Sequence, residues 1–405
     1  MDTVRVLLVG LGGYGNGYVD AMLDHAAELG VELAGAVDPA PGGCRRLEEL
    51  TAAVGTIHPT IETFFAKDAA DLVVIAAPIH LHAPFTIAAL ERGAHVLCEK
   101  PVAAVVQDAR AMAAAEKASD ASVAIGYQWS FSDTIQSIRR DVVAGRFGVP
   151  LQMKTLVFWP RPASYYGRSS WAGALKTAEG AWVLDSPANN ATAHYLHNSL
   201  FVLGAEGGRP QSVEAELYRA NAIESFDTAA IRVETESGAE VLFSTTHAIP
   251  SNVNPVVHYR FSEAELYCNV PGHFYARFAD GSVEDLGSPE ATHADKIRRA
   301  ASDLREGNRP ACTIEDASYQ SLAVCGAHES ASIIDFPRSM VSSIDVSSLS
   351  QSGQSDPLTF VDGLQGALIQ SFAQGVLPAE LGSFEWAKSG RQIDLTGYDG
   401  YPSGR

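Results

Sequence analysis

The beginning of the chain alternates short apolar runs with segments of helical periodicity. Five runs have the nearly continuous apolar character of strands buried on both faces of a parallel sheet: residues 4–9, 31–37, 72–77, 95–98 and 123–125. After the first run, apolar residues recur at the spacing of one helix face until Gly30, and a further helix is expected over 84–92. This order of elements predicts a right-handed, doubly wound α/β domain.

Beyond residue 126 the pattern changes to alternation of apolar and polar positions. The alternation is clear over 213–218, 231–234 and 257–261, and it predicts a large, mostly antiparallel, open sheet with one face on a core. A helix is expected over 185–203. Residues 339–356 are rich in Ser and Gln and have no periodicity, so they are expected to form a flexible excursion on the surface.

Length and charge narrow the class of protein. The 405 residues favour two domains. Lys and Arg total 29 against 48 Asp and Glu, and the net charge of −19 argues against binding to nucleic acid or to a membrane surface. The five cysteines are widely spaced without a C-x-x-C motif, and the N-terminus lacks the basic region of a signal peptide. We therefore expect a cytoplasmic protein with reduced thiols and no metal site.

A G-x-G-x-x-G loop follows the first predicted strand and precedes the first predicted helix. The residues of this loop that we assign to cofactor binding are Gly10, Gly12, Gly13, Tyr14 and Gly15. Glycines here allow a tight turn, a close approach of a pyrophosphate and close packing of helix on strand, while the helix N-terminus attracts the phosphates. The loop predicts a Rossmann dinucleotide-binding domain over 1–126, followed by an α+β domain over 127–405.

Asp38 ends the second predicted strand, where the ribose of an adenosine would lie. A carboxylate there accepts hydrogen bonds from the ribose diol and repels a 2′-phosphate, so NAD is the expected cofactor. Arg45 and Arg46 follow closely and leave NADP as the alternative if their loop folds back, although charges in the first turn of the next helix are the preferred interpretation.

Two further motifs carry a family resemblance: Ala77-Pro78-Ile79-His80-Leu81-His82 and Glu99-Lys100-Pro101. With the glycine loop, they make the chain similar to the Gfo/Idh/MocA family of nicotinamide-dependent oxidoreductases. The resemblance implies that Lys100 lies beside the nicotinamide and the reacting carbon, with Glu99 near the nicotinamide ribose. Ala77, Pro78 and His82 are assigned to the cofactor cleft. It also implies an open sheet that forms homodimers or homotetramers.

The chemistry of Lys100 supports this role independently. Oxidation of an alcohol by hydride transfer requires removal of the hydroxyl proton, and the reverse reaction requires a proton donor. A lysine does either when burial or a nearby positive charge lowers its pKa. The alternative interpretation is a structural pair between Lys100 and Glu99 at the end of a strand.

In the family that the chain resembles, a helix carries an Asp-x-x-x-His motif that faces the substrate. Here Asp185 matches, but Asn189 stands where the histidine is expected. On one helix the two side chains would share a face, and the amide would keep a hydrogen-bond donor and acceptor while losing the acid/base group. His194 lies nine positions beyond Asp185, on the opposite side of such a helix, so a buried structural histidine is its preferred interpretation, and substrate binding the alternative.

Aromatic residues and arginines gather in the same part of the sequence. The candidates for substrate binding are Trp159, Arg161, Tyr166 and Trp171, together with Lys100, Asp185, Asn189 and His194. Aromatic rings stack on the C–H faces of sugars, and arginines bind carboxylates or hydroxyls. A structural core with an interface patch is the alternative.

These features together predict an NAD(P)-dependent oxidoreductase acting on a secondary hydroxyl or ketone of a sugar, cyclitol or related polyol. Lys100 would be the acid/base group, assisted by Asp185 and Asn189. The departure at Asn189 also suggests a lyase or glycosidase that oxidises one sugar carbon transiently. A non-catalytic NAD-binding sensor is the third hypothesis, against which the intact Glu-Lys-Pro motif argues.

Overall fold

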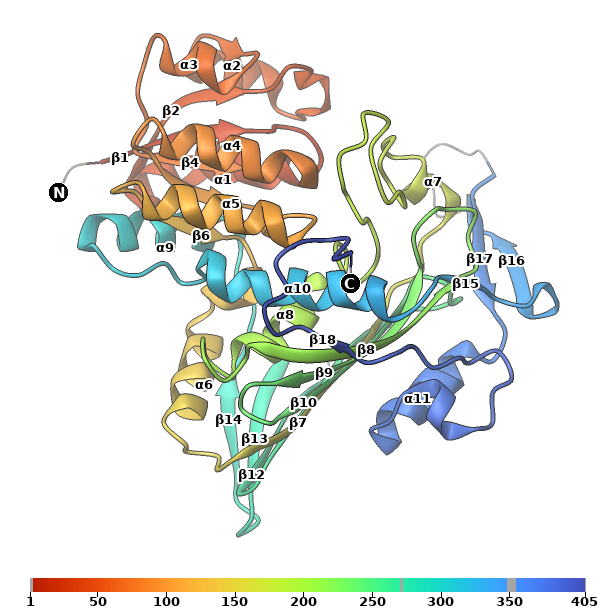
Figure 1. The fold of residues 1–405 in the computed structure, drawn as a ribbon. Helices are drawn as coiled ribbons and strands as arrows, with labels where there is room; N and C mark the ends of the chain where they lie inside the picture. The colour runs from red at the N-terminus through yellow and green to blue at the C-terminus, as the bar shows by residue number, and fades with distance from the viewer. Residues whose placement is uncertain (1–2, 270–271, 348–354, 405) are drawn as a thin grey trace. The chain divides into compact units, whose positions relative to one another are not determined.

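The computed structural model describes residues 3–269, 272–347 and 355–404, and the chain separates into two units (Figure 1). The first unit comprises Met1–Ala103, Gln107–Gln136 and Glu290–Ser318, and the rest of the chain forms the second. The first unit therefore extends beyond the predicted boundary at residue 126, and it includes a segment that returns after most of the second unit. Local periodicity marks helices and strands, but it does not show to which unit a returning helix belongs.

Six parallel strands form the sheet of the first unit in the order β3-β2-β1-β4-β5-β6. The strands are β1 (Val4–Val9), β2 (Val31–Val37), β3 (Ile57–His58), β4 (Leu72–Ile75), β5 (His95–Cys98) and β6 (Val123–Ile125). This order confirms the doubly wound fold, in which the strand order reverses beside β1. The glycine loop follows β1, so it lies at the edge where such sheets bind nucleotides.

Helices connect the strands of this sheet, and several of these helices contact one another. The helices wholly or mostly in this unit are α1 (Asn16–Leu29), α2 (Leu47–Val54), α3 (Ile61–Phe65), α4 (His82–Leu90), α5 (Val106–Lys117) and α9 (His293–Glu306). Helix α1 contacts α2 and α9, whereas α3 contacts α4. The returning helix α9 therefore packs beside the helix that follows the glycine loop.

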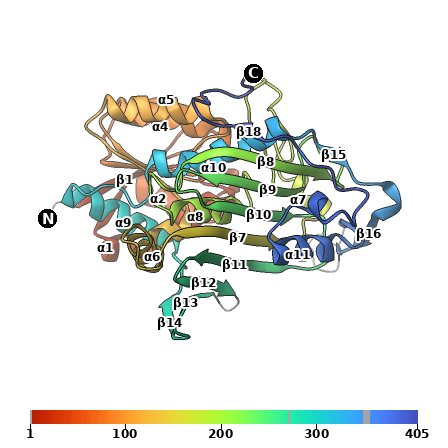
Figure 2. The ribbon, with the colours of Figure 1, turned by 60° about the horizontal axis from the view of Figure 1, so that its bottom comes forward.

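The second unit contains a ten-stranded mixed sheet. Its strands are β7 (Pro150–Phe158), β8 (Pro210–Arg219), β9 (Thr228–Thr235), β10 (Glu240–Thr246), β11 (Val253–Phe261), β12 (Ala264–Asn269), β13 (His273–Phe278), β14 (Val283–Gly287), β15 (Ile334–Asp335) and β18 (Ile393–Asp394). The order is β14-β13-β12-β11-β7-β10-β9-β8-β15, and β18 pairs with β8. Figure 2 shows β8, β9, β10, β7 and β11 side by side. Most pairs are antiparallel, as predicted, but β7 with β10 and β8 with β15 are parallel.

The helices of this unit flank its sheet. They are α6 (Asp133–Val143), α7 (Ala163–Tyr166), α8 (Ala193–Phe201), α10 (Ile314–Ser330) and α11 (Leu364–Gln374), of which α6 and α10 begin in the first unit. Among the helices in the described ranges, none is both long enough and apolar enough to cross a membrane.

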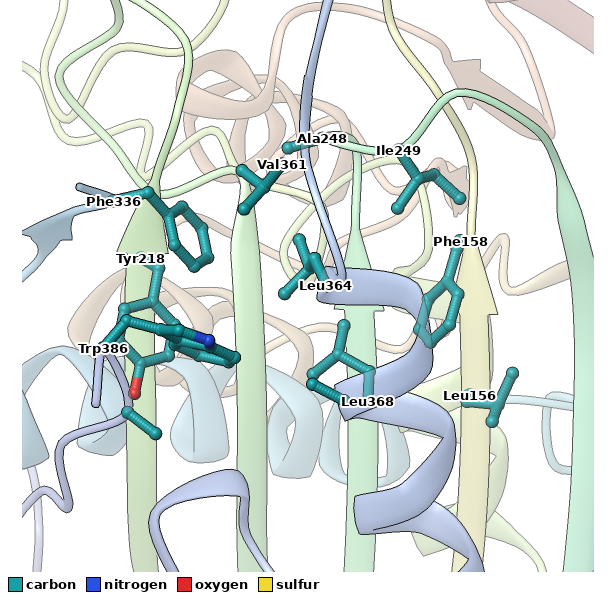
Figure 3. Packing of buried hydrophobic residues seen from close by; sticks show 12 residues of the cluster. Leu156, Phe158, Tyr218, Ala248, Ile249, Phe336, Val361, Leu364, Leu368 and Trp386 are labelled. Carbon is teal, nitrogen blue, oxygen red and sulfur yellow. The ribbon is translucent and has the colours of Figure 1, made fainter. Parts of the chain in front are cut away.

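Consecutive residues of β7 show that both faces of the sheet are covered. Thr155 Oγ1 lies 3.1 Å from Ser199 Oγ of α8, while Lys154 Nζ donates to the Phe372 carbonyl of α11 at 2.9 Å. Because side chains alternate between the faces of a strand, α8 and α11 lie on opposite faces. Leu364 and Leu368 of α11 belong to the same buried apolar cluster as Phe158 of β7 (Figure 3). The prediction of a homo-oligomer assumed a sheet with an open face. Within one chain, however, α8 and α11 partly cover both faces of this sheet.

Two local predictions were wrong. The helix expected over 185–203 is only α8, and the residues before it form turns in which the Asn190 N–H donates to the Ser186 carbonyl. The excursion expected over 339–356 contains the strand β16 (Val341–Asp345), which pairs with β17 (Pro357–Val361). Short serine-rich strands lack the apolar alternation that the sequence argument requires. Residues 348–354 of that excursion lie outside the described residues.

Candidate functional site

The glycine loop connects the carboxyl end of β1 to α1, and its last three residues, Gly13–Gly15, form a 3₁₀ turn. Gly10 has φ +86°, and a Cβ there would lie 2.6 Å from the Ala76 carbonyl oxygen. A Cβ on Gly15 would collide with the Gly10 carbonyl oxygen. The loop is therefore folded tightly against the end of β4, which requires glycine at the first and third motif positions. A Cβ on Gly12 would lie 3.4 Å from the Cα of Gly43, so these two glycines lie side by side.

Asp38 follows β2 and connects its end to the glycine loop. One of its carboxylate oxygens accepts the Leu11 N–H at 2.9 Å, and the other accepts the Ala40 N–H at 2.8 Å. Asp38 is half-buried, so its carboxylate both orders the loop and remains partly accessible at the nucleotide edge. The structure thus places Asp38 beside the loop, as the sequence predicted.

The two arginines that could have favoured NADP form ion pairs with acidic side chains. Arg45 Nη2 lies 2.7 Å from Asp20, and Arg46 Nη1 lies 2.8 Å from Asp24. Arg46 also pairs with Glu49 at 2.7 Å. These contacts favour the interpretation of Arg45 and Arg46 as charges that stabilise neighbouring helices.

We expect Asp38→Ala to weaken NAD binding and to reduce the preference for NAD over NADP, because it removes the acceptor for the ribose diol and the repulsion of a 2′-phosphate. Loss of the Leu11 and Ala40 contacts would also disorder the loop, so Asp38→Asn is the matched control. The amide retains one acceptor oxygen, for either the Leu11 or the Ala40 N–H, while it replaces the other oxygen with a donor and removes the charge. Titration calorimetry with both nucleotides is the measurement. Unchanged affinities in both variants would contradict the assignment of Asp38.

His82 begins α4 and is held between two loops at the same edge of the sheet. Its Nδ1 lies 2.7 Å from the Pro101 carbonyl oxygen, and its Nε2 lies 3.0 Å from the Ala77 carbonyl oxygen. Burial lowers the pKa of His82, although both carbonyls act in the opposite direction. His82 therefore joins the Ala77-Pro78 segment after β4 to the Glu-Lys-Pro turn after β5. Both ring nitrogens face these protein carbonyls.

The Glu-Lys-Pro turn follows β5, and its glutamate is buried. Glu99 Oε2 accepts the Lys100 N–H at 3.1 Å, and Glu99 Oε1 accepts the Tyr18 hydroxyl at 2.5 Å. Lys296 of α9 forms an ion pair with Glu99. Burial alone would raise the pKa of Glu99, but Lys296 and the hydroxyl of Tyr18 hold it below its usual range. Glu99 is therefore a buried carboxylate, and Lys100 beside it is half-buried.

Sequence reasoning missed Tyr18 and Lys296 as partners of this turn. The signal for Lys296 was present, because Lys296 lies in the buried stripe of α9 together with Ile297, Ala300 and Ala301. A lysine that lies among buried apolar residues on one face of a helix requires a buried partner of opposite charge. The partner, Glu99, is 197 positions away in the sequence, so no local pattern could identify it.

In the second unit, Asp185 is buried and accepts hydrogen bonds from three groups. These are the Gly173 N–H at 2.7 Å, Asn190 Nδ2 at 2.7 Å and Arg168 Nη2 at 3.4 Å. The preceding residue, Leu184, has φ +48°, a conformation that is uncommon for a side chain of this size. Asp185 thus fixes a strained turn and joins it to the segment that contains Arg168.

Asn189 is fully buried and does not lie with Asp185 on a helix face, so that prediction was wrong. The Asn189 Nδ2 donates to the Val183 carbonyl at 3.3 Å, and its Oδ1 accepts from Gln320 Nε2 at 3.4 Å. The neighbouring Asn190 contacts Asp185 instead. Pro187 and the Ser186 hydroxyl, which accepts the Asn189 N–H at 3.2 Å, favour a turn here over a regular helix.

Three of the predicted residues, Trp159, Arg161 and Trp171, form a connected group with Tyr165 and Arg168. The Arg161 guanidinium lies 5.6 Å from the Trp159 ring and 4.9 Å from the Tyr165 ring. The Arg168 guanidinium lies 3.7 Å from the Tyr165 ring and 5.2 Å from the Trp171 ring. Two cations thus contact one tyrosine. Other predicted residues nearby in the sequence are Tyr166, at the end of α7, and His194, in the first turn of α8.

The candidate residues form two groups, one in each unit. The first unit holds the glycine loop, Asp38, His82 and the Glu-Lys-Pro turn, and the second holds Asp185, Asn189 and the aromatic and arginine group. Across the residues that the structure describes, no three His, Cys, Asp or Glu side chains gather to form a potential metal site.

Comparison with known proteins identifies relatives of this chain. Residues 4–127 match the Gfo/Idh/MocA family model, described as an oxidoreductase family with an NAD-binding Rossmann fold. The chain is 25% identical over 272 residues to 1,5-anhydro-D-fructose reductase of Ensifer adhaerens, a match that covers 62% of this chain and 80% of that protein. It is 32% identical over 155 residues to inositol 2-dehydrogenase 4 of Saccharopolyspora erythraea, which covers 37% of this chain and 44% of that protein. The match thus spans less than half the length of that inositol dehydrogenase.

Solved structures share the fold. The WlbA dehydrogenase from Bordetella pertussis, in complex with NADH and UDP-GlcNAcA, superposes with a TM-score of 0.66 at 23% identity, covering 81% of this chain and 97% of that chain. An oxidoreductase from Agrobacterium radiobacter, in complex with NAD⁺, L-tartaric acid and magnesium, gives a TM-score of 0.66 at 16% identity, covering 81% of this chain and 96% of that chain. These two structures therefore share the fold of this chain.

Proposed function

Because this chain belongs, through residues 4–127, to the Gfo/Idh/MocA oxidoreductase family, we propose that it transfers hydride between a nicotinamide cofactor and a secondary hydroxyl or ketone of a sugar, cyclitol or related polyol. The observation that carries the proposal is the Glu99-Lys100-Pro101 turn. This turn follows β5 at the same edge of the sheet as the glycine loop after β1. A lysine held there is suited to proton transfer next to a bound nicotinamide.

The first unit has the features that a dinucleotide requires. The glycine positions of the loop carry no side chains, which would let a pyrophosphate approach the main chain, and α1 begins directly after the loop. Asp38 would accept hydrogen bonds from the adenosine ribose. Bound NAD would supply the hydride acceptor or donor. The ion pairs of Arg45 and Arg46 support NAD as the preferred cofactor over NADP.

Lys100 is the proposed acid/base group. During oxidation it would accept the hydroxyl proton of the substrate, and during reduction it would return a proton to the developing alkoxide. Asp185 already accepts from three protein donors, so its proposed contribution is to order the segment that contains Arg168 rather than to carry the proton. This interpretation gives Asp185 a smaller chemical role than the sequence suggested.

The relatives and the second unit support the proposed substrate class. Relatives include 1,5-anhydro-D-fructose reductase and several inositol 2-dehydrogenases. The aromatic and arginine group around Tyr165 offers ring faces and guanidinium donors, which suit polyhydroxylated compounds. We propose a small sugar, cyclitol or polyol as substrate, and a homodimer or homotetramer as the assembly.

A panel of polyols, cyclitols and sugars tests this function. We expect NAD to be reduced by at least one member, as seen by the absorbance of the reduced nicotinamide. Tight NAD binding without turnover across the panel would contradict the dehydrogenase proposal. The second candidate, a lyase or glycosidase with transient oxidation, is motivated by Asn189 at the expected histidine position. It would cleave a glycoside while its NAD is not consumed.

The burial of Asn189 leads to a prediction about the free energy of unfolding. Asn189→Ala should lower the free energy of unfolding by about 1–3 kcal/mol, because the Val183 carbonyl and Gln320 would lose a buried partner. Asn189→His should cost about 1–3 kcal/mol by overpacking a site with no exposed surface. Urea unfolding measures both. A variant that keeps its stability but binds substrate more weakly would instead show that Asn189 contacts the substrate.

A further inference from the structure

We propose that Lys296 of α9 is a positioning residue for the Glu-Lys-Pro turn. It would hold the buried Glu99 carboxylate in place, and through Glu99 fix the main chain of Lys100. The proposal rests on the function above and extends it, because it assigns a role in the cofactor domain to Glu290–Ser318, the segment that returns after the rest of the first unit has ended at Gln136.

The burial of Lys296 is the first observation. Its side chain has 0% exposure, and its charged group forms an ion pair with Glu99, whose side chain is 6% exposed. An ammonium group is almost never fully buried without a paired charge, because removal from water is costly. Helix α9 itself is well defined, since Thr292 and Asp295 form a capping box at its N-terminus and Gly307 ends it. The lysine is therefore brought to Glu99 by a helix that is capped at both ends.

Glu99 receives donors from three separate elements. The Tyr18 hydroxyl from α1 and Lys296 Nζ from α9 both bind Oε1, while the Lys100 N–H binds Oε2 at 3.1 Å. A carboxylate fixed from three directions has little freedom, and one of these bonds goes to the main chain of the proposed acid/base residue. Lys296 therefore acts on Lys100 through Glu99, without touching the reacting atoms.

Two glycines make room for this cluster. A Cβ on Gly126, after β6, would lie 2.7 Å from Glu99 Oε1. A Cβ on Gly17, in the first turn of α1, would lie 2.6 Å from the His293 ring. Both close approaches require glycine. The main chain at Gly126 thus lies directly against Glu99, and the main chain of α1 at Gly17 lies directly against His293 of α9.

The same lysine also reaches the glycine loop. Lys296 Nζ lies 3.3 Å from the Tyr14 hydroxyl and 4.9 Å from the ring centres of Tyr14 and Tyr18. The His293 ring lies 4.5 Å from the Tyr14 ring and 4.7 Å from the Tyr18 ring. Burial and the charge of Lys296 lower the pKa of His293 to about 4, so this ring is neutral near pH 7. Movement of α9 would therefore displace both the loop and the turn.

The charges near Lys296 predict how its substitution would affect Glu99 and Lys100. The titratable groups around Lys296 are Glu99, Tyr14, Tyr18 and His293, with Lys100 near Glu99 and Asp20 near His293. Lys296→Met would leave Glu99 as an unpaired carboxylate in the interior, which is strongly destabilising. The unpaired charge would also favour a protonated Lys100, so that the base form would appear only at higher pH.

The test compares Lys296→Met, Lys296→Arg, Glu99→Gln and the double variant Glu99→Gln/Lys296→Met with the wild type and with Lys117→Met, a control at an exposed lysine in the same unit. Thermal unfolding, NAD affinity by calorimetry, and turnover against pH with a compound that the wild type oxidises are measured below all melting temperatures. For Lys296→Met we expect at least a tenfold loss of turnover at saturating NAD. Its pH of half-maximal turnover should rise by about one unit.

The further variants separate positioning from folding. The double variant should regain part of the melting temperature lost in Lys296→Met but not the wild-type pH profile, and Lys296→Arg should retain more turnover than Lys296→Met. A Lys296→Met protein with the turnover and pH profile of the wild type would overturn the proposal, as would one that loses only stability. If the wild type oxidises no compound tested, the proposed function fails. The melting temperatures of the single variants and of the double variant then still test the buried pair. Losses that simply add would show that Lys296 and Glu99 do not stabilise each other, and would overturn the proposal.

Discussion

Lys100→Met should lower turnover about 10²–10⁴-fold, the range in which general acid–base catalysis contributes. Methionine fills a similar volume but can neither accept nor donate a proton, so the reaction loses its proposed acid/base group. NAD affinity should change little, because the glycine loop and Asp38 carry most of the proposed binding. Steady-state kinetics at saturating NAD and calorimetry with NAD measure the two effects separately.

Two controls accompany this variant. Lys100→Arg retains a positive charge but cannot lose its proton near neutral pH, so it should be almost as inactive. Lys117→Met, at an exposed lysine of the same unit, should have the turnover of the wild type. If Lys100→Met retained more than a tenth of the wild-type turnover, Lys100 would be no more than a structural partner of Glu99.

Gly15→Ala should weaken NAD binding by about tenfold to a hundredfold. The new Cβ would collide with the Gly10 carbonyl oxygen, so the loop and the start of α1 would have to move apart. Overpacking of this kind costs about 1–3 kcal/mol, and each 1.4 kcal/mol corresponds to a factor of ten in affinity. Calorimetry with NAD and thermal unfolding would show a loss of affinity together with a lower melting temperature.

Gly42→Ala is the matched control for the glycine loop. Gly42 lies in the segment after Asp38, where a Cβ would meet no atom within 4 Å and no left-handed conformation is required. This variant should bind NAD as the wild type does. Equal affinities of Gly15→Ala and the wild type would show that the loop does not approach the nucleotide.

The first sheet was largely predictable from the sequence, for a physical reason. Strands β1, β2, β5 and β6 have the predicted bounds, because strands buried on both faces have continuous apolar runs that end abruptly at polar or glycine residues. The missed strand β3, Ile57–His58, has only two residues and carries no pattern. Local composition is informative where both faces of an element are buried, and uninformative where an element is short.

The candidate site was predictable only as far as its local motifs. The glycine loop and Asp38 lie together because their spacing follows the strands of one sheet. By contrast, Lys296 meets Glu99 only when a distant helix returns to the first unit, and Asn190 rather than Asn189 meets Asp185 because the predicted helix begins eight residues late, at Ala193. Such contacts depend on tertiary packing and on turns near Pro187, which hydrophobic periodicity does not encode.

The apolar cluster on the ten-stranded sheet of the second unit could not be predicted from the sequence either. Residues from several segments form one apolar cluster: Leu156, Phe158, Tyr218, Ala248, Ile249, Phe336, Val361, Leu364, Ala367, Leu368, Trp386 and Ala387. Figure 3 shows Trp386 beside Tyr218 and Phe336, away from α11. Because these segments are separated by up to some 230 positions, no window of the sequence contains the pattern. The proposed oligomer would have to use sheet surface outside this cluster.

Transfer of deuterium from the cofactor to a carbon of the substrate tests the proposed chemistry most directly. The protein would be incubated with NADH deuterated on the transferring face of the nicotinamide and with ketone derivatives of sugars and cyclitols, and the products analysed by mass spectrometry. We expect one deuterium on a carbinol carbon of at least one product, and at least a hundredfold slower transfer with Lys100→Met. Tight binding of the cofactor with no deuterium transferred to any compound would contradict the proposal.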